Sequence, residues 1–152
     1  MKRSSIFICG LAGCAAAFST LLYATRPMTR QIIRIPNAPS SPLYSQAVKV
    51  GSTIYVTGII GIDPATNRVS GPTIQEQTRQ ALINCSNILS AAGAKLENVV
   101  EVQVLLARPG DFDGLNEEYA KFFRIDPPIR SVARLGPELP NILVSIKMTA
   151  VL

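Results

Sequence analysis

Residues 127–131, which read Pro-Pro-Ile-Arg-Ser, contain the side chain of this sequence best suited to holding a small ligand. They place Arg130 near the start of a predicted strand, where a loop meets the sheet. A guanidinium presents a planar fork of N–H donors that matches a carboxylate, so Arg130 is a candidate clamp for an organic acid. The alternative is an ordinary surface or interface arginine that pairs with a glutamate.

The chain contains no histidine, which excludes several kinds of catalytic site. An imidazole base, an imidazole zinc ligand and a Ser/His/Asp relay are all impossible. Tryptophan is absent and aromatic residues make up 6%, which leaves few platforms for stacking nucleic-acid bases. Cys9 and Cys14 lie in an apolar run without further ligands, and Cys85 fits a helix core position, so no metal site is expected.

The formal net charge of +5 belongs to the first part of the chain. Of the 15 basic residues, five lie in the first 40, so residues 41–152 hold ten basic and all ten acidic side chains. A fold that binds nucleic acid is expected to keep its excess positive charge on the folded part, so no nucleic-acid partner is favoured. The five basic residues are Lys2, Arg3, Arg26, Arg30 and Arg34.

Residues 1–30 have the composition of a leader, ahead of one domain over residues 31–152. The acid-free, Ser- and Arg-containing composition favours a mitochondrial presequence. An apolar block of about 19 residues also fits a secretory signal or an uncleaved anchor, which would be the chain's contact with a membrane. Residues 11–14 (Leu-Ala-Gly-Cys) leave a lipoprotein open as a further alternative, and a start at Met28 would give a cytosolic form.

The pattern of the domain is strand, strand, helix, strand, helix, strand, strand. A hairpin is predicted around the Gly51-Ser52 turn, and a capping box formed by Thr73 and Glu76 marks the start of the first helix. Asp111 is expected to cap the second helix. The predicted ranges are strands within 48–57, a loop over 58–70, a helix from 73 to Gly93, a strand over 99–106, a helix over 111–123 and strands over 129–135 and 142–152.

Two helices are too few to cover both faces of a parallel sheet, so the prediction is an α+β layer with both helices on one face. Both sides of the last strand carry apolar side chains. The uncovered sheet face is most readily buried against copies of the same chain, which predicts an oligomer.

A series of short motifs resembles the RidA/YjgF family of reactive intermediate deaminases over about residues 32–152. The motifs are YSQAV (44–48), IYVTG (54–58), DPAT (63–66), EQTRQAL (76–82), AAGA (91–94), DF (111–112), NEEY (116–119) and RS (130–131). The resemblance implies a chorismate-mutase-like α+β fold with a mixed sheet, and a homotrimer around a central barrel with clefts between subunits. It also implies hydrolysis of 2-imino acids, such as 2-iminobutanoate and 2-iminopropanoate, to 2-oxo acids and ammonia without a cofactor.

The resemblance gives several residues expected roles. Arg130 matches the arginine that holds the substrate carboxylate, and Tyr44 the tyrosine near the cleft. Thr57 stands where the family usually has a serine, Gly58 follows it, and Asn116 matches the asparagine of the second helix. An imine is electrophilic already, so such an enzyme needs mainly to bind the acid, orient the C=N bond and position a water.

The last strand departs from the family pattern. Ser145 occupies the position of the glutamate thought to hold the attacking water, and Lys147 that of a second glutamate. A hydroxyl can bond to a water but cannot take its proton at neutral pH, and general-base catalysis contributes roughly 10²- to 10⁴-fold. Pro42-Leu43 and Val132 depart from the family's usual residues too.

Two functions from different classes follow from these residues. The first is an imine deaminase of weak or shifted activity, with Arg130 and Ser145 as its catalytic residues. The second is a trimer that binds small carboxylates in a regulatory role without turnover. A ribonuclease role, sometimes attached to this family, is less favoured because the neutral domain lacks a basic stripe and an imidazole pair.

Overall fold

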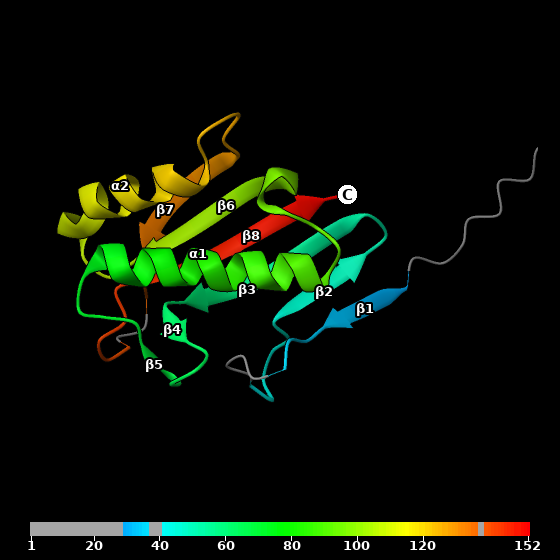
Figure 1. The fold of residues 1–152 in the computed structure, drawn as a ribbon, viewed down its shortest axis with the longest axis horizontal. Coiled ribbons are helices and arrows are strands. Elements are labelled where there is room, and N and C mark those ends of the chain that lie inside the picture. The colour runs from blue at the N-terminus through cyan, green and yellow to red at the C-terminus, as the bar shows by residue number, and fades with distance from the viewer. Residues whose placement is uncertain (1–28, 37–40, 137–138) are drawn as a thin grey trace, which may run out of the picture.

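The computed structural model describes residues 29–36, 41–136 and 139–152. Six strands form one mixed sheet in the order β1-β2-β3-β8-β6-β7, with a small hairpin, β4–β5, beside it (Figure 1). The strands are β1 (Arg30–Ile33), β2 (Ala47–Val50), β3 (Thr53–Ile60), β4 (Ile62–Asp63), β5 (Arg68–Val69), β6 (Val99–Leu106), β7 (Ile129–Arg134) and β8 (Val144–Val151); the helices are α1 (Ile74–Ala91) and α2 (Phe112–Phe122).

The predicted hairpin is confirmed, but the sheet extends further on its β2 side than the sequence pattern indicated. β2 and β3 pair in antiparallel register around Gly51, whose φ of 59° suits a residue without a side chain. β1 was not predicted, because its four residues have a weak pattern of their own and depend on pairing with β2. Within the domain, Gln46 fixes the chain after β1, since its Oε1 accepts a hydrogen bond from Ile35 N at 2.7 Å.

The prediction of a loop over residues 58–70 was wrong in part: residues 64–67 form a turn, but residues 58–60, 62–63 and 68–69 are strand. β3 continues to Ile60, because its apolar residues pair with β8 beyond the end of β2. β4 and β5 then form a short hairpin, with Asn67 in the left-handed region at φ 55°. The turn is held by Asp63, whose Oδ1 accepts a hydrogen bond from Ala65 N at 2.9 Å. Asp and Asn side chains favour such local turns, which makes the segment ordered.

The two helices begin where the sequence predicted, but only one is capped as expected. At α1 the Thr73 hydroxyl accepts from Glu76 N while the Glu76 carboxylate accepts from Thr73 N, so the capping box is confirmed. Asp111 occupies the N-cap position directly before α2, but its side chain makes no capping hydrogen bond. Its carboxylate pairs with Arg108 at 2.8 Å instead, because an ionised partner competes successfully for it.

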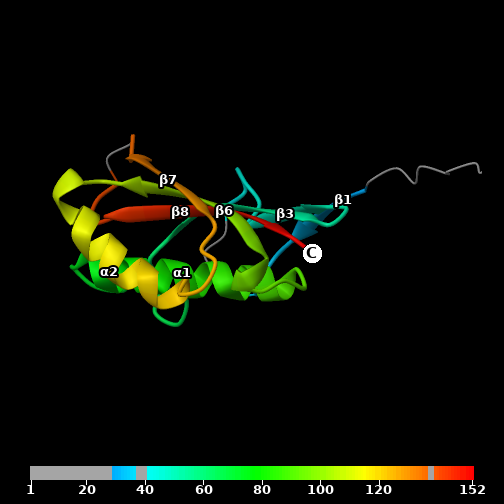
Figure 2. The ribbon, with the colours of Figure 1, turned by 90° about the horizontal axis from the view of Figure 1, so that it is seen from above.

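Both helices cover one face of the sheet, as predicted, and the opposite face lies open (Figure 2). Alternate residues of β8 are buried beneath the helices, and so is the apolar stripe of α1 that includes Cys85. Burial in this core raises the pKa of the Cys85 thiol above its usual range. The β8 residues on the covered side are Val144, Ile146, Met148 and Ala150.

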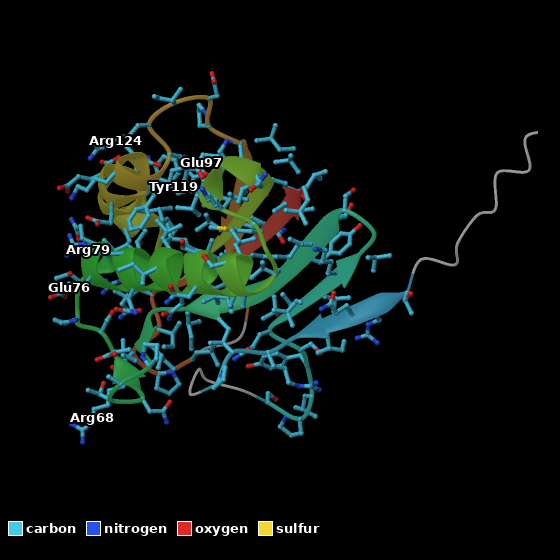
Figure 3. The ribbon with its side chains drawn as sticks, turned by 45° about the vertical axis from the view of Figure 1, so that its right-hand side comes forward. Arg68, Glu76, Arg79, Glu97, Tyr119 and Arg124 are labelled. Atoms are coloured by element: carbon cyan, nitrogen blue, oxygen red, sulfur yellow. The ribbon has the colours of Figure 1, made fainter. Side chains whose placement is uncertain are left out.

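A buried carboxylate joins the two helices. Glu118 of α2 is 1% exposed and accepts hydrogen bonds from Arg79 of α1 at 2.6 and 2.9 Å and from Lys121 at 2.7 Å. Arg79 and then Lys121 hold the pKa of Glu118 below its usual range, against the effect of burial. The ion pair therefore fixes α2 against α1. Figure 3 labels Arg79 on α1 and Tyr119 on α2.

The predicted leader lies outside the described residues, apart from positions 29 and 30. Within the part of the chain that the structure describes, no helix combines the length and apolar character needed to cross a bilayer. The open sheet face carries exposed apolar side chains, including Tyr55 at 48% and Val151 at 40%. These residues form the surface for which the sequence predicts burial against other copies.

Candidate active site

Arg130 lies on β7, the strand at one edge of the sheet. Its guanidinium packs on aromatic rings of α2. The guanidinium carbon is 4.7 Å from the ring centroid of Tyr119 and 5.9 Å from that of Phe112. Residues 112, 116 and 119 share one face of the helix, so Asn116 lies between these two rings. We call the group Phe112, Asn116, Tyr119 and Arg130 the arginine edge.

The arginine edge contains polar groups without partners. Asn116 Oδ1 and Tyr119 Oη are buried and make no hydrogen bond, and among the described residues no carboxylate forms an ion pair with Arg130. Burial raises the pKa of Tyr119 to about 12, with Arg130 acting in the opposite direction, so the phenol stays protonated at neutral pH. An unpaired buried polar atom costs about 1–3 kcal/mol, which favours an external partner for this group.

Tyr44, Thr57 and Gly58 lie together at a second place, the free edge of β3. The last backbone bond to the preceding strand runs from Thr57 N to Gln46 O at 3.0 Å. Beyond it the register with β8 shifts at a bulge between Val56 and Ile59. The three predicted residues line a cavity of about 360 Å³ that is wrapped around this edge.

Ser145 lies beside Gly58 on the open side of the sheet. A β-carbon at position 58 would approach Ser145 Oγ to 2.8 Å, so the glycine makes room for the side chain at 145. Ser145 is 7% exposed, whereas Lys147, two residues along the same strand face, is exposed and forms no ion pair with a described residue. We call Tyr44, Thr57, Gly58 and Ser145, with the adjoining cavity, the cavity edge.

The structure does not bring the two edges together within one chain. In the strand register Arg130 is opposite Val102, Val102 opposite Met148, and Met148 opposite Val56. Three strand spacings separate the first and last of this row, which is about 14 Å. Arg130 also faces the helices, whereas Ser145 faces away from them. A small acid held by Arg130 can meet Ser145 and Thr57 only if these come from another copy.

Sequence reasoning missed the rings that support Arg130. In the sequence, Tyr119 and Phe112 were noted as parts of the motifs NEEY and DF. The spacing of residues 112, 116 and 119 was a usable signal, because it places two aromatics and an amide on one helical face. Nothing in the sequence located that face against β7, since their contact depends on the parallel pairing of β6 and β7.

The geometry offers anion binding and steric selection but no metal centre. No cluster of three or more His, Cys, Asp or Glu that could hold a metal occurs among the residues described. The two edges supply a guanidinium, two phenols, an amide and two aliphatic hydroxyls. They suit the orientation of a small organic acid and of a water molecule.

Known proteins resemble this chain over most of its length. The family model described as Endoribonuclease L-PSP matches residues 35–152. The human 2-iminobutanoate/2-iminopropanoate deaminase is 36% identical over 125 residues, covering 82% of this chain and 91% of its own. Reactive Intermediate Deaminase A, chloroplastic, from Arabidopsis thaliana is 31% identical over 136 residues, covering 89% and 73%.

A solved structure agrees with these relatives. RidA from the Antarctic bacterium Psychrobacter sp. PAMC 21119 superposes with a TM-score of 0.74 at 32% identity, covering 80% of this chain and 99% of that one. The resemblance read from the motifs is thereby confirmed, together with the α+β fold. This chain belongs to the RidA/YjgF family.

Proposed function

We propose that this chain hydrolyses 2-imino acids, such as 2-iminobutanoate and 2-iminopropanoate, to 2-oxo acids and ammonia. The relatives named imine deaminases support the reaction class. The observation that carries the proposal is the guanidinium of Arg130, held 4.7 Å from the Tyr119 ring and without an ion pair among the described residues. A cation fixed in this way is ready to receive the carboxylate of a ligand.

In the proposed reaction, water adds to the carbon of the C=N bond and the resulting carbinolamine expels ammonia, which leaves a 2-oxo acid. Arg130 of one copy holds the carboxylate, with the Asn116 amide beside it. Thr57 and Gly58 of a second copy border the reacting carbon, and Ser145 gives the water a hydrogen bond. The substrate is already electrophilic, so orientation supplies much of the acceleration.

The rate is expected to be modest, because no carboxylate at position 145 can accept a proton from the water. This residue favours a second candidate, a member that binds small carboxylates in a regulatory role without turnover. The two candidates share the Arg130 clamp and differ only in whether the bound imine is hydrolysed faster than in buffer.

The test is ammonia release from 2-imino acids formed in situ by an amino acid oxidase. Wild-type protein is expected to exceed the buffer rate. Arg130 is exposed in the single chain, but in the proposed cleft it would be the desolvated partner of the substrate carboxylate, so Arg130→Ala is expected to lower kcat/KM by about 100- to 1000-fold. Arg68→Ala, an exposed arginine on β5, is the matched control and is expected to retain the wild-type rate. A wild-type rate equal to that of buffer would leave only the binding role.

We further propose a homotrimer in which the open sheet faces enclose a central barrel and each cleft lies between two copies. The separation of the two edges and the exposed apolar side chains of the open face support it. Light scattering of the purified domain is expected to give three times the chain mass. A monomer or dimer that is fully active would contradict this assembly.

We also propose that residues 1–30 form a leader that directs the chain to the mitochondrion, with secretion or membrane anchoring as the alternative. The acid-free composition supports a presequence, and a plant relative carries the name of an organelle, the chloroplast. N-terminal sequencing of the protein from its native cell tests this. A mature chain that begins before Arg26 would contradict a cleaved presequence.

A further inference from the structure

The cavity at the free edge of β3 is lined mostly by hydrocarbon. Its volume is about 360 Å³, within the range of roughly 300–1,000 Å³ found for small-molecule sites. It opens beside Tyr44, Thr57 and Gly58, and none of the described residues that line it is charged. The apolar lining consists of Ile35, Pro36, Ile59, Ile60, Ile62, Pro64 and Ile88.

The polar residues of the cavity are largely committed to holding its wall. Asn84 Nδ2 donates to Ile62 O at 2.8 Å and to Ile60 O at 3.3 Å, and its Oδ1 accepts from Gln80 at 2.9 Å. Gln46 Oε1 accepts from Ile35 N at 2.7 Å. Asn87, which is exposed, borders the cavity from α1. A ligand group entering the cavity therefore meets mainly isoleucine side chains.

We infer that this cavity receives the substrate side chain, so that the preferred substrates are 2-imino acids with uncharged aliphatic side chains longer than an ethyl group. The inference rests on the proposed function and names the substrate class of the same site. A methyl or ethyl group would leave most of the cavity unfilled. A side-chain carboxylate would lose its hydration there without meeting a cation.

Transfer of each methylene from water into such a lining is worth about fourfold in binding, the equivalent of about 0.8 kcal/mol. The leucine-derived substrate carries three more side-chain carbons than the alanine-derived one. Its kcat/KM is therefore expected to be at least about tenfold higher, even with part of the gain lost to imperfect packing. The glutamate-derived substrate is expected to react more slowly than the leucine-derived one.

The experiment compares ammonia release from imino acids formed from leucine, alanine and glutamate, each corrected for its rate in buffer. Asn87→Phe would fill the cavity from its border and is expected to bring the leucine-to-alanine ratio of kcat/KM toward one. Ile83→Phe is the matched control, because it adds the same ring to α1 one turn away, at a residue that is 38% exposed and outside the cavity. It is expected to keep the wild-type ratio.

Calorimetric binding of the product acids separates this inference from the proposed function. We expect 4-methyl-2-oxopentanoate to bind at least about tenfold more tightly than pyruvate, and Asn87→Phe to remove the difference. Turnover of the substrates without a preference for the longer chain overturns the inference and leaves the proposed function standing. Selective binding without turnover would support this inference about the cavity and overturn the proposed hydrolysis. If the protein showed no binding and no turnover, both the inference and the proposed function would be overturned.

Discussion

The arginine edge lies at β7 and the cavity edge at β3, three strands apart in one sheet, and the two differ in charge and in the state of their polar groups. The arginine edge contains a cation, two aromatic rings and two buried polar atoms without partners. The cavity edge is neutral, and the amides of Gln46 and Asn84 already make hydrogen bonds within the chain. The arginine edge is suited to binding a negatively charged group, and the cavity edge to selecting a ligand by its shape. Under the proposed function, neither edge is a complete site by itself.

The largest effect is expected from mixing two inactive variants, which tests whether the two edges of each site come from different copies. Arg130→Ala damages the arginine edge, and Gly58→Val damages the cavity edge because its β-carbon lies too close to Ser145 Oγ. Each variant alone is expected to be nearly inactive. If every site uses one edge from each of two copies, random reassembly of equal amounts restores about one quarter of the sites.

The measurement is ammonia release after the two variants are unfolded and refolded together. Refolding each variant alone is the control, and size-exclusion chromatography shows whether Gly58→Val assembles. A mixture that assembles normally and stays inactive would show that both edges act within the same copy.

The next largest effect is expected on kcat, from placing a proton acceptor at position 145 of the cavity edge. Ser145→Glu adds a carboxylate beside Gly58, where there is no side chain to obstruct it, and kcat is expected to rise at least about tenfold. Ser145→Gln is the matched control, since it has the same shape without the charge. An equal gain with glutamine would attribute the effect to size rather than to proton transfer.

A smaller effect is expected from the rings of the arginine edge. Tyr119→Leu keeps an apolar core residue but removes the ring beneath Arg130, an interaction worth about 0.5–2 kcal/mol. KM is expected to rise about three- to tenfold while kcat changes less, because the cation loses its fixed orientation. Tyr119→Phe restores the ring without the hydroxyl, so the part of KM that it recovers belongs to the ring and the rest to the phenol hydroxyl. A large fall in kcat with unchanged KM would contradict a positioning role.

The smallest effect concerns the support of the arginine edge and appears in stability. Arg79 and Lys121 lower the pKa of Glu118, so the folded protein binds this proton less readily than the unfolded chain. Stability from Glu118 is therefore present above its ordinary pKa of about 4.3 and is lost as pH falls through the folded value. Glu118→Gln is expected to lower the thermal midpoint at pH 7, with the difference from wild type shrinking under acid. A difference that does not change with pH would exclude this linkage.

Local patterns in the sequence predicted elements that depend on local interactions. The Thr73–Glu76 capping box, the Gly51 turn and the alternation over β6 each involve residues close in the chain. β1 and the β4–β5 hairpin were missed, because their short runs become strands only through pairing with distant partners or a turn held by side chains. The same reason explains Asp111, whose side chain bonds to Arg108 rather than to the helix.

The candidate site divides in the same way. The sequence could single out Arg130 by its chemistry and, through the family resemblance, Tyr44, Thr57, Gly58, Asn116 and Ser145. It could not place Arg130 and Thr57 at different edges, since that separation follows from the strand order β3-β8-β6-β7. The cavity was equally out of reach, because its lining comes from residues more than 50 positions apart.

The distance across the sheet has a consequence for the behaviour of the protein in dilute solution. If each reaction centre is shared between molecules, a chain that has lost its neighbours can remain folded and still be inert. Specific activity would then fall with concentration near the dissociation constant of the assembly, before any loss of secondary structure. The turnover number of such a protein would therefore depend on its own concentration.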